Sequence, residues 1–300
     1  MNVISRRKFV QAAAVLPLSG LARAADLPAV VVDAHVHCFA GKDSREFPYH
    51  EKAPYTPDGL PPERLLERMK QAGVDRAIIV HPEPFQDDHR YLEHCLSVGK
   101  EKFKGTCLFF AAQDDSPAKL RELVRRVPGK VVALRIHAYA PERLPPFEKP
   151  ELKRLWQTAA DLGLAVQLHF EPRYAAGFEP LIREFPKTTV IIDHLGRPFQ
   201  GKPEEHAVVV KWSRYENTIM KLSAIPEQRQ YPHREIAPII KELVTAFTAN
   251  RLIYGGGFDE RATGESYRAA REAVRAYLGG LNAEQQALVL GGNAARVFGF

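Results

Sequence analysis

Histidines recur at the ends of apolar runs, and the first group has the spacing of a metal-binding pair. Asp33, His35 and His37 alternate at the end of the apolar run 30–32. Because a β-strand turns alternate side chains to the same face, we expect these three to point the same way, with the two imidazoles side by side at the strand's carboxyl end. Two neighbouring imidazoles can bind one divalent metal ion, although an isolated His-x-His pattern is weak evidence by itself.

Polar residues also end three later apolar runs. Arg135 and His137 end the run 131–137, His169 lies at the end of 165–170, and His194 follows 188–193. A single histidine at a strand tip is commonly a packing residue, but every buried imidazole needs hydrogen-bond partners. Polar ends on four different strands therefore predict that these side chains converge on one site.

The chemistry expected of such a site is metal-assisted hydrolysis. A catalytic zinc site uses about three protein ligands and leaves one position for water. The ion lowers the pKa of that water from ~15.7 towards ~7 and polarises a carbonyl group. The planar guanidinium of Arg135 matches a carboxylate and suggests an acidic small-molecule substrate, a structural salt bridge being the alternative.

Other polar residues are candidates for the same pocket or for the surface. Lys221 and Ser223, in the run 218–223, and His81, at the end of 76–81, are expected to add substrate contacts, again with a structural role as the alternative. The remaining histidines fall in loops or helices and are predicted to lie at the solvated surface; they are His50, His89, His94, His206 and His233.

The elements that must position these residues alternate along the chain. Eight short apolar or β-branched runs occur at 30–37, 76–81, 105–110, 131–137, 165–170, 188–193, 218–223 and 251–255. Most gaps carry helical patterns, for example 62–72 and 151–162. Strands that alternate with helices pair in parallel, and eight such units predict a (β/α)₈ barrel in one domain, residues 25–300. A doubly wound open sheet is the alternative, but no Gly-x-Gly-x-x-Gly follows the first run.

The connections indicate which end of the barrel is functional. The turns that lead into strands are short, whereas the loops that leave them are long and rich in polar and aromatic residues. Catalytic residues of this fold lie at the carboxyl ends of the strands. The loop 39–60 is long enough to act as a lid over that end.

The amino terminus has the pattern of an export signal. Arg6, Arg7 and Lys8 precede the short apolar stretch 12–21 and the small-residue exit 22–24, which is typical of a cleavable twin-arginine signal over 1–24, with a frayed basic terminus as the alternative. The formal charge of the whole chain is +6, and removal of the four positive charges of this segment leaves +2. We therefore expect a periplasmic protein with no nucleic-acid or membrane partner. Three cysteines do not form a disulfide framework, although an oxidising compartment permits one bridge.

From residue 31 to residue 300 the sequence resembles the amidohydrolase-related, metal-dependent hydrolases with a barrel fold, in the branch of pyrone-dicarboxylate and sugar-lactone hydrolases. The resemblance rests on the motifs 33–37, 164–169, 190–198, 221–223 and 290–298. It implies that His35, His37 and His169 bind a divalent metal, zinc by expectation. It also implies that His194 orients water or the substrate carbonyl, and that Arg135 lies where carboxylate-bearing substrates are held.

The eighth strand departs from this family pattern. The relatives end it with a Trp-Gly-Ser-Asp-Trp-like run whose aspartate binds metal or acts as general base, and Gly257 stands at that position. Asp259 keeps the facing but lies ~6.6 Å further along an extended strand, beyond the reach of a metal–oxygen bond. The glycines 255–257 permit a bulge that returns Asp259 to the site as a catalytic residue, or else the close approach of a ligand. Without an aspartate, His194 is the expected base.

Three functions remain open from the sequence. The leading one is an exported hydrolase that opens a lactone or related cyclic ester of an acidic or sugar-derived compound. Non-oxidative decarboxylation by the same residues is a second, enzymatic, possibility. The third is a catalytically silent periplasmic ligand-binding protein, which the glycine at position 257 motivates.

Overall fold

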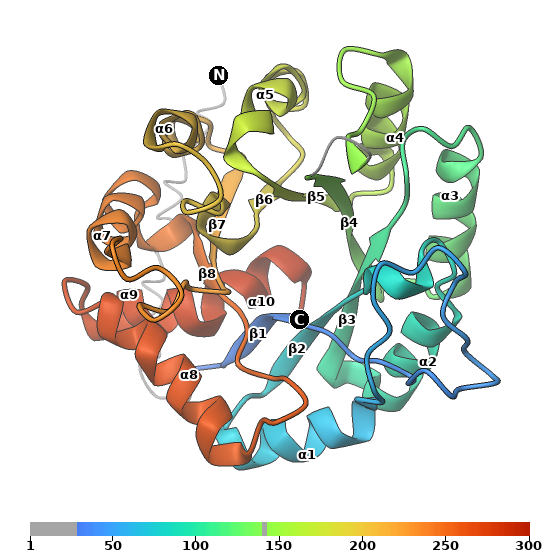
Figure 1. Cartoon of the computed structure of the whole chain (residues 1–300), viewed down its shortest axis with the longest axis horizontal. Coiled ribbons are helices and arrows are strands. Elements are labelled where there is room, and N and C mark those ends of the chain that lie inside the picture. The colour runs from blue at the N-terminus through green and yellow to red at the C-terminus, as the bar shows by residue number, and fades with distance from the viewer. Residues whose placement is uncertain (1–28, 140–142) are drawn as a thin grey trace, which may run out of the picture.

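The computed structural model describes residues 29–139 and 143–300, which form one sheet of eight parallel strands. The strands follow one another around the sheet in chain order (Figure 1). Their bounds are β1 Val32–Val36, β2 Arg76–Val80, β3 Phe103–Leu108, β4 Val131–Ala138, β5 Ala165–Phe170, β6 Val190–Ile192, β7 Thr218–Leu222 and β8 Leu252–Tyr254. The end of β8 returns to β1, because a Cβ atom added to Gly255 would lie 2.8 Å from the Cβ of His35. The predicted (β/α)₈ barrel is confirmed, and the open-sheet alternative is wrong.

Helices surround the strands on the outside (Figure 1). They are α1 Pro62–Ala72, α2 Arg90–Gly99, α3 Ser116–Arg126, α4 Pro150–Asp161, α5 Ala175–Glu184, α6 Pro203–Lys211, α7 Ile236–Phe247 and α8 Gly264–Tyr277, followed by the short α9 Ala283–Ala287 and α10 Asn293–Phe298. Each of the first eight follows the strand of the same number, which is the order that parallel pairing requires.

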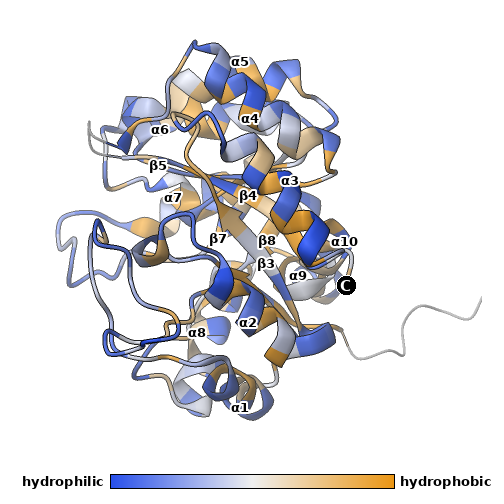
Figure 2. Cartoon of the chain, turned by 90° about the vertical axis from the view of Figure 1, so that its right-hand side faces the viewer, coloured by the Kyte–Doolittle hydropathy of each residue, from blue (hydrophilic) through white to orange (hydrophobic). Residues whose placement is uncertain are grey.

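Two apolar layers hold the barrel together. Side chains such as Val32, Ile78 and Ile191 fill its interior, and a larger layer packs between the strands and the helices. Figure 2 shows apolar residues concentrated on the central strands and mixed colours on the helices around them. The interior layer supports the histidines from below, so they are held at the carboxyl end of the barrel rather than inside it.

The first strand contains a bulge that changes which residues face the barrel interior. Asp33 pairs with Ala77 and Val36 with Ile79, so β1 uses one residue more than β2 between these points. The side chain of Asp33 therefore turns outward, where its carboxylate accepts a hydrogen bond from the hydroxyl of Tyr267 in α8 at 2.7 Å. The expectation that Asp33 shares a face with the two histidines is wrong for this reason.

The loop 39–60 folds back at its base and lies along the neighbouring loop. Phe39 and Leu60 exchange backbone hydrogen bonds, and the His50 amide donates to the Pro84 carbonyl at 2.9 Å. No helix within the described residues combines the length and the apolar character needed to cross a membrane. The predicted signal, residues 1–24, lies outside the described residues.

Candidate active site

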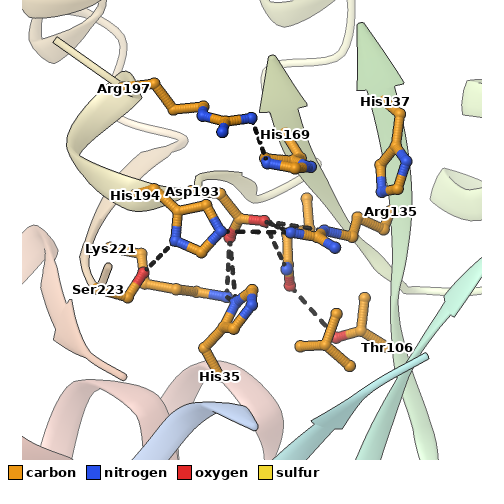
Figure 3. Close-up of polar contacts among 12 residues, drawn as sticks. His35, Thr106, Arg135, His137, His169, Asp193, His194, Arg197, Lys221 and Ser223 are labelled. Atoms are coloured by element: carbon orange, nitrogen blue, oxygen red, sulfur yellow. Dashed lines mark hydrogen bonds and ion pairs between the residues drawn. The ribbon is translucent and has the colours of Figure 1, made fainter. Parts of the chain in front are cut away.

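Five histidine rings form a continuous row across the carboxyl end of the barrel. The order is His37, His35, His194, His169 and His137, with neighbouring ring centroids 4.5–5.2 Å apart. They come from β1, β4, β5 and the end of β6, as the strand-end pattern predicts. Figure 3 shows four of these rings arranged around Asp193 and Arg135.

The pair at the start of this row has the geometry of two metal ligands. The Nε2 atoms of His35 and His37 lie 3.3 Å apart. Two nitrogens bound to a tetrahedral zinc at ~2.0–2.1 Å are separated by about the same distance. The Nδ1 atom of His37 lies 2.7 Å from the Val80 carbonyl oxygen. That oxygen can only accept, so the proton is on Nδ1 and the Nε2 lone pair is free, as in many metal-binding histidines.

A second combination of donors shares His35. One ligand atom each from His35, Asp193 and His194 lies within 4.8 Å of the others. The ammonium nitrogen of Lys221 lies 3.4 Å from Nδ1 of His35. The other ring nitrogen of His35, Nε2, faces His37. The described residues therefore fit a divalent cation at His35 and His37, with His194 and Asp193 next to it.

Asp193 is the central anion of the site and is fully buried. Its Oδ2 accepts from Arg135, at 3.0 Å from Nε and 2.9 Å from Nη2, and from Gln167 at 3.0 Å. Its Oδ1 forms an ion pair with the Lys221 ammonium at 3.0 Å. Burial raises the pKa of Asp193, but Lys221 and Arg135 outweigh burial and hold that pKa well below its usual value. The single carboxylate of Asp193 thus partly neutralises the charges of two buried cations, Arg135 and Lys221.

The turn after β6 explains how adjacent residues both reach the site. On an extended strand Asp193 and His194 would face opposite sides. The strand ends at Ile192, and His194, Leu195, Gly196 and Arg197 all adopt left-handed backbone conformations with φ between 55° and 67°. Such conformations are costly for residues other than glycine. They nevertheless direct His194 and Arg197 into the same mouth, as Figure 3 shows.

A buried histidine fastens this turn from behind. The Nε2 atom of His206, in α6, lies 2.7 Å from the Leu195 carbonyl oxygen, and only 5% of the residue is exposed. His89 is also buried, and its Nε2 accepts a hydrogen bond from the Leu108 amide at 3.1 Å. The prediction of a surface role is wrong for both residues, because each satisfies a backbone group inside the protein.

Arg197 places a positive charge beside the neutral His169, on the far side of the row. The Arg197 Nη1 atom donates to His169 Nε2 at 2.8 Å. Both residues line a cavity of about 190 Å³ that also contains His194, Gln200 and Tyr231. Within the described residues, Arg197 forms no ion pair with a carboxylate. The site therefore contains a partly exposed guanidinium that is open to an anionic ligand.

The environment keeps the row of histidines neutral. Burial, together with the nearby cations Arg135, Lys221 and Arg197, lowers the pKa of His194 to about 3, although Asp193 opposes the shift. In the neutral ring, Nε2 accepts from Arg135 at 3.4 Å and Nδ1 donates to the Ser223 hydroxyl at 2.9 Å. His194 is thus poorly suited to be a base near neutral pH until negative charge enters the site.

Three of the predicted substrate contacts are used within the protein instead. Arg135 is occupied by Asp193 rather than facing a substrate carboxylate. Lys221 has no exposed surface and lies behind His35 and Asp193. His81 is also fully buried, contacts the Gln86 carbonyl at 2.9 Å and stacks on His89, outside the row of histidines. In each case the side chain has a partner inside the protein.

The glycines after β8 do not return Asp259 to the site. Asp259 is exposed, and its carboxylate accepts a hydrogen bond from the backbone amide of Arg261 at 2.8 Å. The Gly256 amide instead donates to Asp33 at 2.7 Å. A side chain at Gly257 would face α8, since its Cβ would lie 2.8 Å from that of Ala270. The catalytic role considered for Asp259 is wrong in this structure.

His137 keeps its place in the mouth and borders a second cavity. Its Nδ1 atom lies 3.7 Å from the Glu83 carboxylate, and its Nε2 atom is buried without a hydrogen-bond partner in the described part of the chain.

Three charged residues of the site, Asp193, Arg197 and Glu83, were not identified from the sequence. Asp193 and Arg197 lie within the motif 190–198 on either side of His194, and charged residues near a strand-end histidine were the available signal.

Comparison with known proteins agrees with this fold. The amidohydrolase family model matches residues 32–300, and the chain belongs to that family of hydrolytic enzymes. It is 27% identical over 247 residues to 2-pyrone-4,6-dicarboxylate hydrolase of Comamonas testosteroni, covering 76% of each chain. It is also 27% identical over 244 residues to L-fucono-1,5-lactonase of Burkholderia ambifaria, covering 75% of this chain and 78% of that one.

Two solved structures share the fold at lower identity. One is a probable 2-pyrone-4,6-dicarboxylic acid hydrolase of Acinetobacter baumannii with citric acid bound; it has a TM-score of 0.72 and 19% identity, over 90% of this chain and 99% of that one. The other is an amidohydrolase of Burkholderia multivorans with zinc bound, with a TM-score of 0.70 and 15% identity, over 91% of this chain and 100% of that one.

Proposed function

We propose that this protein hydrolyses a lactone that carries a carboxylate group. Family membership supports hydrolysis, and the names of the curated relatives support a lactone ring. The observation that carries the proposal is Arg197, a guanidinium in the mouth of the barrel that forms no ion pair with a described carboxylate and lies beside His169 and His194. A substrate carboxylate bound there places the rest of the substrate over the row of histidines.

The reaction follows from these positions. A water oxygen bonds to the lactone carbonyl carbon, the ring carbon–oxygen bond breaks, and the ring oxygen takes up a proton, which gives a hydroxy acid. Negative charge held at Arg197 offsets part of the positive charge that helps to depress the pKa of His194, so this ring becomes a better proton acceptor when substrate is present. A divalent ion held by His35 and His37, zinc in our proposal, supplies carbonyl polarisation and easier ionisation of water when bound.

We also propose that the protein acts in the periplasm. The twin-arginine pattern at 5–10 and the small-residue exit at 22–24 support this location. Cell fractionation and amino-terminal sequencing of the mature protein test it. A cytoplasmic protein with an intact amino terminus would contradict it.

The activity test uses carboxylated and neutral lactones of the same ring size. The probes are 5-oxotetrahydrofuran-2-carboxylate and γ-butyrolactone, followed with a pH indicator before and after loading with zinc or manganese. We expect Arg197→Gln to lower kcat/KM for the carboxylated lactone by roughly 10- to 100-fold, the value of one charged hydrogen-bonded contact, and to change the neutral one little. Arg183→Gln, at an exposed position of α5, is the matched control.

The alternatives give different results in the same assay. Carbon dioxide release without a hydroxy-acid product would replace the proposal by decarboxylation. Tight binding of the carboxylated lactone with no turnover, with or without metal, would replace it by ligand binding alone. Equal effects of Arg197→Gln on both lactones would remove Arg197 as the carboxylate anchor.

A further inference from the structure

A line of polar side chains crosses the interior of the barrel below the row of histidines. The Thr106 hydroxyl, on β3, donates to Oε1 of Gln167, on β5, at 3.2 Å. The Gln167 amide in turn donates from Nε2 to Oδ2 of Asp193 at 3.0 Å. Thr106 and Gln167 have no exposed surface, and Asp193 is 1% exposed. Figure 3 shows dashed contacts that lead from Thr106 to Asp193, above which the histidines lie.

The Thr106–Gln167 pair lies in a layer that is otherwise filled by valine, alanine and isoleucine side chains. The strand between the two residues, β4, places Ala133 opposite Thr106, and its single methyl group leaves room for the pair to meet. A buried hydroxyl or amide is costly unless it is hydrogen-bonded, and two apolar side chains would fill the same space without that cost. The polar pair therefore indicates a role at Asp193 rather than in packing.

The pair determines which way the Asp193 carboxylate faces. Its Oδ2 atom accepts from Gln167 and from two nitrogens of Arg135, and these two residues are direct neighbours in the register of β4 and β5. Because Oδ2 is held by donors from two adjacent strands, Oδ1 is directed to the other side. There it lies 3.0 Å from the Lys221 ammonium and 3.7 Å from Nδ1 of His35.

This orientation controls what contacts the His35 ring. The Lys221 ammonium lies closer to Asp193 than to Nδ1 of His35, at 3.0 Å against 3.4 Å. If the carboxylate turned away, the ammonium would donate to Nδ1, and the ring proton would lie on Nε2, where it would block a cation. The outer partners of a ligand histidine commonly fix its orientation and its tautomer in this way.

We propose that Thr106 and Gln167 are positioning residues of the divalent-cation site. They hold the Asp193 carboxylate on the Lys221 ammonium, and this leaves Nε2 of His35 free to bind the ion together with His37. The inference rests on the cation site of the proposed function. It adds two residues, from β3 and β5, that act from beneath the site through Asp193.

The test is the zinc affinity of metal-stripped protein, measured by competition with a chromophoric chelator. Gln167→Met keeps the length of the side chain and removes the amide. We expect it to raise the zinc dissociation constant by roughly 10- to 100-fold, the usual effect of losing an outer partner of a metal site. Thr106→Val removes only the hydroxyl that holds the amide and should raise the constant less. Thr106→Ser keeps that hydroxyl and should bind zinc as the wild type does.

A matched control separates positioning from packing. Ile78→Val shortens a fully buried side chain of the same interior layer, and it should leave the zinc dissociation constant unchanged even where thermal unfolding shows a loss of stability. An equal rise in Ile78→Val, or no rise in Gln167→Met and Thr106→Val, would overturn the assignment. If Gln167→Met does not fold, the comparison of Thr106→Val with Thr106→Ser decides.

The zinc titration does not depend on turnover, so it separates this inference from the proposed reaction. Weaker zinc binding by Gln167→Met, in a protein that hydrolyses no lactone, would support the positioning role and contradict the reaction. A wild type that binds neither zinc nor manganese would overturn the inference and leave lactone hydrolysis without metal standing.

Discussion

The ends of β6 and β8 face the same mouth but are built in opposite ways. The β6 end carries Asp193, followed by His194 and Arg197 on a left-handed turn that departs from ordinary backbone geometry. The β8 end carries three glycines, 255–257, and no side chain that reaches the row of histidines. The end of β6 therefore contributes polar side chains to the site, whereas the end of β8 contributes small residues and a backbone amide that donates a hydrogen bond.

The end of β6 contains the strained backbone, whereas the end of β8 contains the close contact between strands. Gly255 lets β8 approach β1 beneath His35, and the Gly256 amide donates to the outward-facing Asp33. The β6 turn is instead held by charge, through Asp193, and by the buried His206.

Removal of the Asp193 charge should have the largest effect. Asp193→Asn leaves Arg135 and Lys221 buried without their common anion, and we expect a loss of about 3–5 kcal/mol in the free energy of unfolding. Denaturant titration at pH 7.5 measures it. Asp161→Asn, on an exposed acid at the end of α4, should change stability by less than ~0.5 kcal/mol. A loss below ~1 kcal/mol for Asp193→Asn would show that the β6 turn does not depend on this charge.

An acid introduced at the glycine end should destabilise the protein without adding a base. Gly257 has φ 108°, and a Cβ there would lie 2.8 Å from that of Ala270. We expect Gly257→Asp to lower the free energy of unfolding by about 2–3 kcal/mol and to leave lactone turnover no higher. Gly280→Asp is the control, since nothing lies within 4 Å of a Cβ added at Gly280. Increased turnover at unchanged stability would mean that position 257 faces the histidines after all.

The barrel and the row of histidines could be predicted because both follow from regular patterns. Apolar runs alternate with helical segments, and parallel strands bring their carboxyl ends together, so His35, His137, His169 and His194 had to meet. The orientation of Asp33 could not be predicted, since it depends on a one-residue bulge for which the β1 sequence carries no distinct signal.

The pairing of charges could not be predicted for a related reason. The sequence places Arg135 at a strand end but does not say whether its partner is a substrate or a neighbouring strand. The left-handed turn that follows Asp193 and directs His194 and Arg197 into the site has these two residues at positions where glycine is usual, so no local preference indicates it. The burial of His81 and His206 depends on backbone carbonyls that only the folded chain brings near them.

Acid sensitivity tests whether buried histidines away from the β6 turn also matter. Burial lowers the pKa of His81 to about 4, so the unfolded chain, with an ordinary value of ~6.5, binds the proton more tightly below pH 6.5. Stability should therefore fall as pH drops from ~6.5 towards ~4, with a contribution of about 2 kcal/mol from His81 at pH 5. Between pH 7.5 and pH 5, the free energy of unfolding of His81→Gln should fall by about 2 kcal/mol less than that of the wild type.

The control for this titration is His233→Gln, at an exposed position. It should follow the wild-type pH dependence. If the pH dependence of His81→Gln also matches the wild type, His81 does not contribute to acid sensitivity and the other buried histidines account for it.

The smallest expected effect concerns how His206 holds the β6 turn. His206→Ala removes the hydrogen bond to the Leu195 carbonyl, and we expect a loss of about 1–2 kcal/mol in stability. Because the same turn aims Arg197, KM for the carboxylated lactone should rise more than kcat falls. His206→Gln should restore KM, since its amide nitrogen can reach the position of Nε2, and His233→Ala should change neither constant. Loss of stability with an unaltered KM would show that His206 only packs the turn, and that the left-handed backbone alone sets the position of Arg197.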